Sequence, residues 1–234
     1  MKNFKYFRII FLGIAAFSFY GCDLDLQEGF TFKPDVDLTD PFDDITAWQF
    51  LRQNTQLNEE GELDGELYNY MVAAIEAAGL VEEYNGTNSN RTYLFLNNNA
   101  FTGGGDVIDL VTGEEEVAEG ETPADVMARA DLDILRTILR YHIITEYVEQ
   151  LTLSERNVNY TFQTLIPGED GEIVLRRDER YNVDINTEPA PLPSSATSQN
   201  ERIRNYNYVL SNGIGHTIAD PVRNRPYPAP NLGM

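Results

Sequence analysis

Cys22, His142 and His216 are the only cysteine and histidines of this 234-residue chain, and they are the first candidates for chemistry. A thiolate is a nucleophile and an acyl acceptor, and an imidazole readily exchanges a proton near neutral pH. Two histidines cannot form a three-histidine metal site, and a single cysteine cannot close a disulfide within the chain. Neither G-x-S-x-G nor H-E-x-x-H occurs in the sequence. We therefore expect no catalytic residue, no metal and no cofactor.

Carboxylates are far more abundant, with 38 Asp and Glu against 17 Lys and Arg and a formal net charge of −21. In so acidic a chain, neighbours such as Asp43 and Asp44 are expected by chance. A glycosidase-like hydrolase would need two carboxylates facing one cleft, and we keep it as a third hypothesis. The acid excess argues against nucleic acid as a partner, because phosphates are bound by Lys and Arg. Divalent cations such as calcium are expected to bridge this acidic surface.

The first 21 residues are typical of a secretory signal. Lys2, Lys5 and Arg8 give a basic start, and an apolar run from Ile9 to Phe19 follows. Eleven helical residues span roughly 16 Å, about half of the ~30 Å hydrocarbon layer of a membrane. A permanent membrane-spanning helix is therefore disfavoured, and residues 1–21 are predicted to be removed.

Gly21 and Cys22 resemble the lipobox of bacterial lipoproteins, in which the cysteine is acylated and the signal is cut before it. Phe19 and Tyr20 depart from the leucine and small residue that are common there. The resemblance implies a lipid at Cys22 that holds the chain on the cell envelope, in the outer membrane or at the cell surface. An ordinary secretory signal with a chance cysteine remains the alternative. Loss of three cations with the signal would take the net charge from −21 to −24.

The rest of the chain is interpreted as a tether, a domain and a tail. Residues 22–43 are rich in aspartate without a hydrophobic period and are predicted to be an acidic tether. An ordered domain is expected over residues 44–226, and a proline-rich tail over 227–234. The chain after Cys22 has thirteen arginines and one lysine, and we expect the arginines to pair with carboxylates of the acidic surface.

Hydrophobic residues recur at helical spacing in four segments. Helices are expected over 44–56, over 67–78 with Gly79 as the stop, from the capping box at Thr122, and after Asp131 with Leu132, Leu135 and Leu139 inward. Residues 102–121 and 187–200 are rich in loop-forming residues and are expected to be loops.

Strand-like segments dominate the later part of the chain. The apolar run from Thr92 to Leu96 indicates a strand buried on both faces. Further strands are expected over 141–147, 160–165, 173–177, 181–185, 206–210 and 214–219. Helices early and strands late indicate one α+β domain.

Four of these segments, in the same order along the chain, resemble the signatures of the fasciclin domain family. They are RTYLFLNNNAF from Arg91, LRTILRYHII over 135–144, the pair Thr164-Leu165, and NGIGHTIADP over 212–221. The chain departs from the family pattern at Asn97 in place of proline, at Gly215 in place of valine or isoleucine, and at Ala219. The resemblance implies a wedge-shaped β-sandwich of about seven strands with several helices packed on it. It also implies the use of such domains for adhesion in cell-surface and matrix proteins.

The resemblance gives structural rather than catalytic roles to the signature residues. His216 alternates with Ile214 and Ile218 on a strand, which places it over an apolar core. A buried imidazole needs hydrogen-bond partners, and backbone groups are expected to supply them. The predicted structural residues are Tyr141, His142, Asn212, Gly213, His216 and Asp220.

The leading hypothesis from the sequence is a lipid-anchored envelope protein. Its fasciclin-like domain would mediate adhesion or bind an extracellular protein or polysaccharide. The alternative is an accessory or scaffold subunit of an envelope complex for nutrient capture. The identity of the ligand and the oligomeric state are not encoded in any motif.

Overall fold

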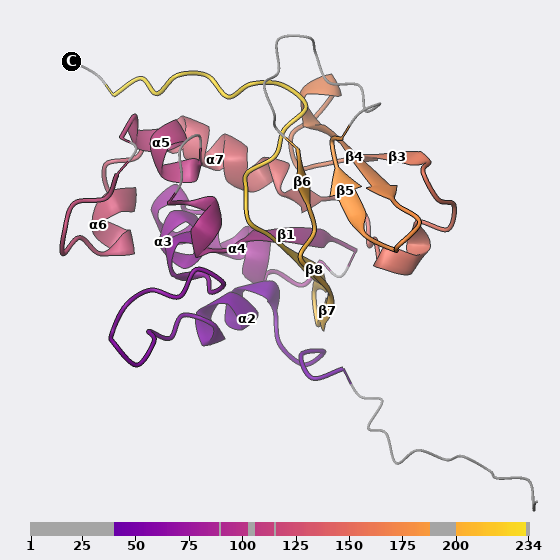
Figure 1. Cartoon of the computed structure of the whole chain (residues 1–234), viewed down its shortest axis with the longest axis horizontal. Coiled ribbons are helices and arrows are strands. Elements are labelled where there is room, and N and C mark those ends of the chain that lie inside the picture. The colour runs from indigo at the N-terminus through magenta and orange to yellow at the C-terminus, as the bar shows by residue number, and fades with distance from the viewer. Residues whose placement is uncertain (1–39, 89, 103–105, 115, 188–199, 233–234) are drawn as a thin grey trace, which may run out of the picture. The chain divides into compact units, whose positions relative to one another are not determined.

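The computed structural model describes residues 40–88, 90–102, 106–114, 116–187 and 200–232 (Figure 1). They all belong to one compact unit. The predicted signal, the predicted lipid site at Cys22 and almost all of the predicted tether lie outside the described residues. No helix in the described ranges is long and apolar enough to cross a membrane.

The first sheet has the strand order β2-β1-β8-β7. Strand β1 (Thr92–Leu96) lies between β2 (Ile143–Ile144), to which it is antiparallel, and β8 (Gly213–Ile218), to which it is parallel. Strand β7 (Asn205–Leu210) completes the sheet by pairing antiparallel with β8. Every residue of β1 is buried, as the apolar run predicts.

The second sheet is antiparallel throughout and has the order β3-β4-β5-β6. Its strands are β3 (Asn159–Gln163), β4 (Glu172–Arg177), β5 (Val183–Ile185) and β6 (Glu201–Arg202). An isolated bridge between Ile144 and Thr164 joins β2 to the chain that leaves β3, so the two sheets are connected by hydrogen bonds. The described residues thus form an α+β fold with two sheets of four strands each.

Six helices accompany these sheets in the described part of the chain, and Figure 1 shows them on the left of the picture, with the second sheet on the right. They are α2 (Ala47–Gln53), α3 (Asn69–Ala78), α4 (Val81–Asn85), α5 (Val107–Thr112), α6 (Pro123–Met127) and α7 (Leu132–Tyr141). Short 3-10 turns cover Asn98–Ala100, Gln150–Thr152 and Glu169–Gly171.

Local sequence signals explain the ends of several helices. Gly79 takes the left-handed conformation, with φ of 69°, and ends α3 where the sequence predicts. Thr122 and Asp125 form the predicted capping box of α6. Thr46 forms a second capping box with Gln49, so α2 begins at residue 47 rather than 44.

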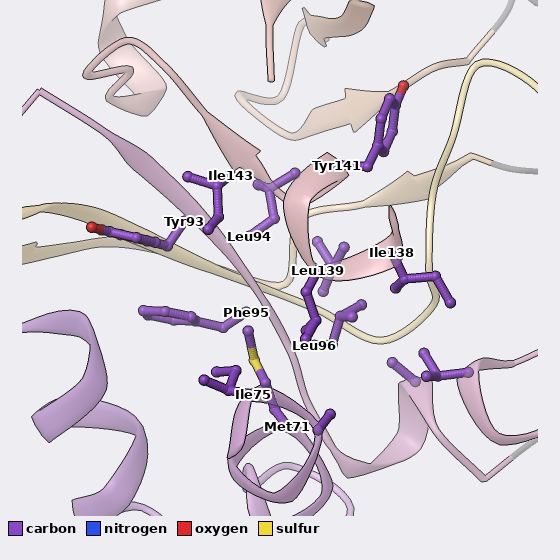
Figure 2. Packing of buried hydrophobic residues seen from close by; sticks show 14 of the residues in the cluster. Met71, Ile75, Tyr93, Leu94, Phe95, Leu96, Ile138, Leu139, Tyr141 and Ile143 are labelled. Atoms are coloured by element: carbon purple, nitrogen blue, oxygen red, sulfur yellow. The ribbon is translucent and has the colours of Figure 1, made fainter. Parts of the chain in front are cut away.

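The core lies where α3 and α7 meet β1. Met71 and Ile75 of α3 and Leu139 of α7 are fully buried, and Figure 2 shows them around the side chains of β1. Tyr93 and Phe95 point to the same side of β1 because side chains alternate along a strand (Figure 2). Phe95 stacks on Phe50 of α2 with ring centroids 5.4 Å apart.

Three further expectations from the sequence are wrong. Residues 102–121 are not only loop, because Val107–Thr112 form α5, which buries its apolar residues against α7. Residues 141–147 are not one strand, because α7 continues through Tyr141 and only Ile143–Ile144 pair with β1. Leu132 is 38% exposed rather than inward, because it lies in the first turn of α7, beyond the core that covers Leu135 and Leu139.

Candidate functional site

His142 follows the last residue of α7 and is completely buried. Its Nδ1 lies 2.7 Å from the carbonyl oxygen of Ile138, and its Nε2 accepts the amide of Val222 at 3.1 Å. The backbone carbonyl of His142 accepts the amide of Leu94 in β1. One residue therefore ties α7, the first sheet and the chain after β8 together.

His216 lies in β8 and is 2% exposed. Its Nε2 lies 2.8 Å from the carbonyl oxygen of Val148, and its Nδ1 accepts the amide of Asn207 at 3.1 Å. Asn207 has φ of 59° at the irregularity where β7 shifts register against β8. The imidazole thus satisfies an amide that the strand ladder leaves without a partner there.

Both imidazoles are held in the neutral form. Each ring has one nitrogen that donates to a carbonyl and one that accepts from an amide, which is the pattern of a neutral tautomer. Burial lowers the pKa of His142 and of His216 from 6.5 to about 4, against a smaller opposing effect of the carbonyl partners. Since all four ring nitrogens are engaged with backbone groups, neither ring is placed to act as a base on a bound molecule.

Asn212 connects three segments at the turn between β7 and β8. Its Oδ1 accepts the amide of Ala47, the first residue of α2, at 2.9 Å. Its Nδ2 donates to the carbonyl oxygens of Tyr84 at 2.8 Å and Gly86 at 3.0 Å, at the end of α4. Asn212 is only 1% exposed, so these bonds replace hydrogen bonds to water.

Gly213 and Gly215 are required by close packing on β1. Gly213 has φ of 149°, and a Cβ there would lie 2.4 Å from the carbonyl oxygen of Arg91. A Cβ on Gly215 would lie 2.2 Å from the ring of Phe95. The valine or isoleucine that the family pattern has at this position would therefore clash with the ring of Phe95.

Tyr141 joins α7 to the second sheet. Its hydroxyl donates to the carbonyl oxygen of Glu172 at 2.7 Å and accepts the Nδ2 of Asn186 at 3.0 Å. Burial raises the pKa of the Tyr141 hydroxyl well above its usual value of 10, so the group stays neutral.

Asp220 forms a carboxyl pair with Glu201, a residue that the sequence analysis did not single out. Burial, followed by the hydrogen bond with Asp220, raises the pKa of Glu201 from 4.5 to about 7. A hydrolase would use such a pair only inside a cleft. Neither the cleft beside α7 nor the cleft beneath Asn231 is lined by these two residues.

The six predicted residues are not brought together into one site. Tyr141 and His142 are consecutive at the end of α7, Asn212 and Gly213 form the turn before β8, and His216 lies further along β8. None of the six lines either of the two clefts named above. No group of three or more His, Cys, Asp or Glu that could hold a metal occurs in the part of the chain that the structure describes. Tyr141, His142, Asn212 and His216 share a different property, because each forms hydrogen bonds between elements of the fold.

The model of the fasciclin domain matches residues 66–222, which is most of the described region and contains all six predicted residues. The chain belongs to the fasciclin family. The resemblance seen in the four sequence segments is thereby confirmed at the level of the family.

The comparison with solved structures includes one match to a pair of FAS1 domains. A FAS1 domain pair from the insect cell adhesion molecule Fasciclin I matches with a TM-score of 0.47 and 14% identity. The match covers 71% of this chain and 51% of that chain, so this chain spans about half the length of the insect pair. A comparison with curated protein sequences gives no match.

Proposed function

We propose that this fasciclin protein is lipid-anchored in the cell envelope and binds an extracellular protein or polysaccharide in an adhesive role. The observation that carries the proposal is the family match over residues 66–222, because fasciclin domains are found in cell adhesion proteins. Tyr141, His142, Asn212 and His216 are buried and form hydrogen bonds with backbone groups, so the proposal assigns recognition to the surface that they hold in place.

The anchor in this proposal depends on the first 22 residues of the sequence. A basic start, a short apolar run and Gly21-Cys22 are the features that support acylation. Two or three acyl chains would hold the protein stably, at ~0.8 kcal/mol per buried methylene, where one chain would not. The 22 residues of the proposed tether could place the domain at most about 75 Å from the lipid.

Radioactive palmitate tests the anchor directly. We expect the label to enter the full chain in a bacterial host that acylates lipoproteins, and the labelled chain to sediment with membranes. The variant Cys22→Ala should take up no label and should leave the membrane fraction. Equal labelling of both chains, or of neither, would contradict the anchor.

Adhesion of cells that display the chain tests the binding role. We expect cells with the full chain to attach to a surface coated with the native extracellular matrix. Cells that display residues 1–43 fused to an unrelated domain are the matched control and should not attach. Equal attachment would contradict the role, and co-purification of one envelope protein at fixed stoichiometry would favour the accessory-subunit alternative instead.

A further inference from the structure

A cleft with a volume of about 380 Å³ lies beside α7 and is lined by three arginines. Arg136 and Arg140 come from α7, and Arg223 comes from the chain after β8. The other side of the cleft is formed by Leu165, Ile166 and Pro167, which follow β3. Three guanidinium groups at one cleft are unexpected on a chain with a net charge of −21.

The positive charges of the two arginines of α7 are only weakly neutralised by nearby carboxylates. They are four residues apart and therefore share one face of the helix. The Nε of Arg136 donates to the carbonyl oxygen of Ala78 at 3.1 Å, and its terminal nitrogen lies 3.5 Å from Asp133, a carboxylate that is 97% exposed. Arg140 is exposed and has no ion pair among the residues that the structure describes.

The guanidinium of Arg223 gives the strongest indication that an anion belongs in the cleft. It is only 7% exposed, and its Nε has no hydrogen-bond acceptor in the described part of the chain. One terminal nitrogen donates to the carbonyl oxygen of Pro226 at a long 3.4 Å, and the guanidinium lies 4.9 Å from the ring centroid of Tyr227. A buried cation without an anion is costly, and the ring offsets only part of that cost. Arg223 lines the cleft and has no ion pair among the described residues, so an anion bound there would supply the opposite charge that its guanidinium lacks.

The chemistry of the lining selects an oxyanion. Guanidinium groups bind carboxylate, sulfate and phosphate oxygens through two parallel hydrogen bonds. The residues that line this cleft include three arginines and one carboxylate, Asp133. The acidic remainder of the surface is screened beyond about 8 Å at physiological salt, so a site at contact distance can still bind an anion.

The remaining lining suits a sugar ring. Leu165, Ile166 and Pro167 offer an apolar wall for its C–H face, and Asp133 and Thr137 offer oxygen atoms to its hydroxyl groups. We propose that this cleft binds an acidic saccharide, with its carboxylate or sulfate group held by Arg136, Arg140 and Arg223. The saccharide in this proposal rests on the proposed function, and the anion rests on the cleft alone.

Calorimetric titration of the full chain in detergent tests the site. The probes are digalacturonate, a sulfated disaccharide and neutral galactobiose. We expect saturable binding of at least one acidic probe and none of galactobiose. Arg140→Gln should weaken that binding at least about tenfold, because a charged hydrogen bond is lost. The matched control Arg180→Gln removes an exposed arginine near β5 and should change the affinity less than about twofold.

Several outcomes would overturn the proposal. One is that Arg140→Gln binds the acidic probe as tightly as the wild type. Another is that the control Arg180→Gln weakens binding as much as Arg140→Gln does. A third is that the chain binds inorganic sulfate or phosphate but neither acidic saccharide. Arg140 is exposed, so its variant should keep the melting temperature of the wild type. Arg223→Gln is the second variant and should weaken binding as strongly if it folds.

The cell-attachment assay separates this inference from the proposed function. Loss of saccharide binding in Arg140→Gln with attachment unchanged would support the cleft and assign adhesion to another surface. Attachment by the wild type without any saccharide binding would overturn the cleft and leave the adhesive role in place.

Discussion

At the scale of single residues, the ring of Phe95 fits in the core only because Gly215 has no side chain. The ring of Phe95 stacks on Phe50 and Tyr93 and fills the space that a Cβ at position 215 would need. We expect Gly215→Val to lower the free energy of unfolding by roughly 2 kcal/mol, because a packed core tolerates extra volume poorly. Urea unfolding measures this change.

A second substitution checks the cause. Phe95→Leu on its own should also destabilise the domain, since it removes buried contacts. If the clash with the ring is the reason, the smaller leucine makes room for the methyl groups of the introduced valine. The double variant should then lose less stability than the sum of the two single losses. Strictly additive losses would show that Phe95 is not what excludes a side chain at position 215.

The buried histidines give the domain a defined pH dependence. His142 and His216 have pKa values of about 4 in the folded chain and near 6.5 when unfolded. As the pH falls below 6.5, the histidines take up protons in the unfolded chain before they do so in the folded chain. The two neutral histidines therefore make their full contribution to the free energy of unfolding above pH 6.5, and this contribution is lost as the pH falls toward 4. Each histidine lowers the free energy of unfolding by up to about 1.4 kcal/mol per pH unit in this window.

The carboxyl pair of Glu201 and Asp220 changes the free energy of unfolding in the opposite direction as the pH falls. The effect of a histidine is therefore best measured by comparing a histidine variant with the wild type. The pKa of Glu201 is raised to about 7, and its protonation favours the folded chain as the pH falls from 7 to 4.5. We expect His216→Gln to be less stable than the wild type at pH 7 and the difference to narrow at pH 5. Urea unfolding of both chains at pH 7 and pH 5 measures this difference. Glu201 is present in both chains, so its contribution cancels in the comparison. A difference in the free energy of unfolding that is the same at both pH values would contradict a neutral His216.

At the scale of elements, Asn212 holds α2 and α4 against the turn before β8. Asn212→Ala would leave the amide of Ala47 and the carbonyl oxygens of Tyr84 and Gly86 without partners. We expect a loss of about 2–4 kcal/mol in the free energy of unfolding, since buried polar groups lose their hydrogen bonds. Hydrogen exchange at the start of α2 should become faster.

Asn205 in β7 provides the comparison for that prediction. It is exposed, and Asn205→Ala should change the free energy of unfolding by no more than about 0.5 kcal/mol. Equal effects of the two substitutions would mean that the hydrogen bonds of Asn212 do not join these elements.

The elements that the sequence predicts well are those with strong local signals. The period of α3 ends at a glycine, α6 begins at a capping box, and β1 is an unbroken apolar run. The sequence predicts α5 poorly because its six residues lie between glycine- and glutamate-rich segments, and packing on α7 stabilises so short a helix. The end of α7 is obscured because Tyr141 and the isoleucines after it are apolar in either conformation.

The candidate site follows the same division. The histidines and Asn212 could be found from the family signatures, because each lies in a recognisable segment. The pairing of Glu201 with Asp220 could not be predicted, since nothing in the sequence distinguishes Glu201 from the other acidic residues among the 38. The arginine cleft had a partial signal in the four-residue spacing of Arg136 and Arg140, but its third member comes from another part of the chain.

At the scale of the whole molecule, the acid excess has a thermodynamic consequence. Repulsion among carboxylates opposes folding, and divalent cations reduce it by binding between them. We expect calcium, added at constant ionic strength, to raise the melting temperature of the full chain. Sodium chloride at the same ionic strength is the control, and an unchanged melting temperature with calcium would contradict this bridging.

The two halves of the proposed function belong to different parts of the chain. The lipid at Cys22 would fix the protein to a membrane, and the fasciclin domain would reach a ligand outside the cell. Neither part alone would link a membrane to a matrix, so the proposed adhesive role depends on both.

Vesicle attachment tests this combined role most directly. Vesicles carrying the acylated full chain are compared with bare vesicles and with vesicles mixed with Cys22→Ala, on a surface coated with native extracellular matrix. We expect only the vesicles with the acylated chain to attach, and attachment to be lost when the fasciclin domain is replaced by an unrelated one. Attachment no stronger than that of bare vesicles would contradict the account.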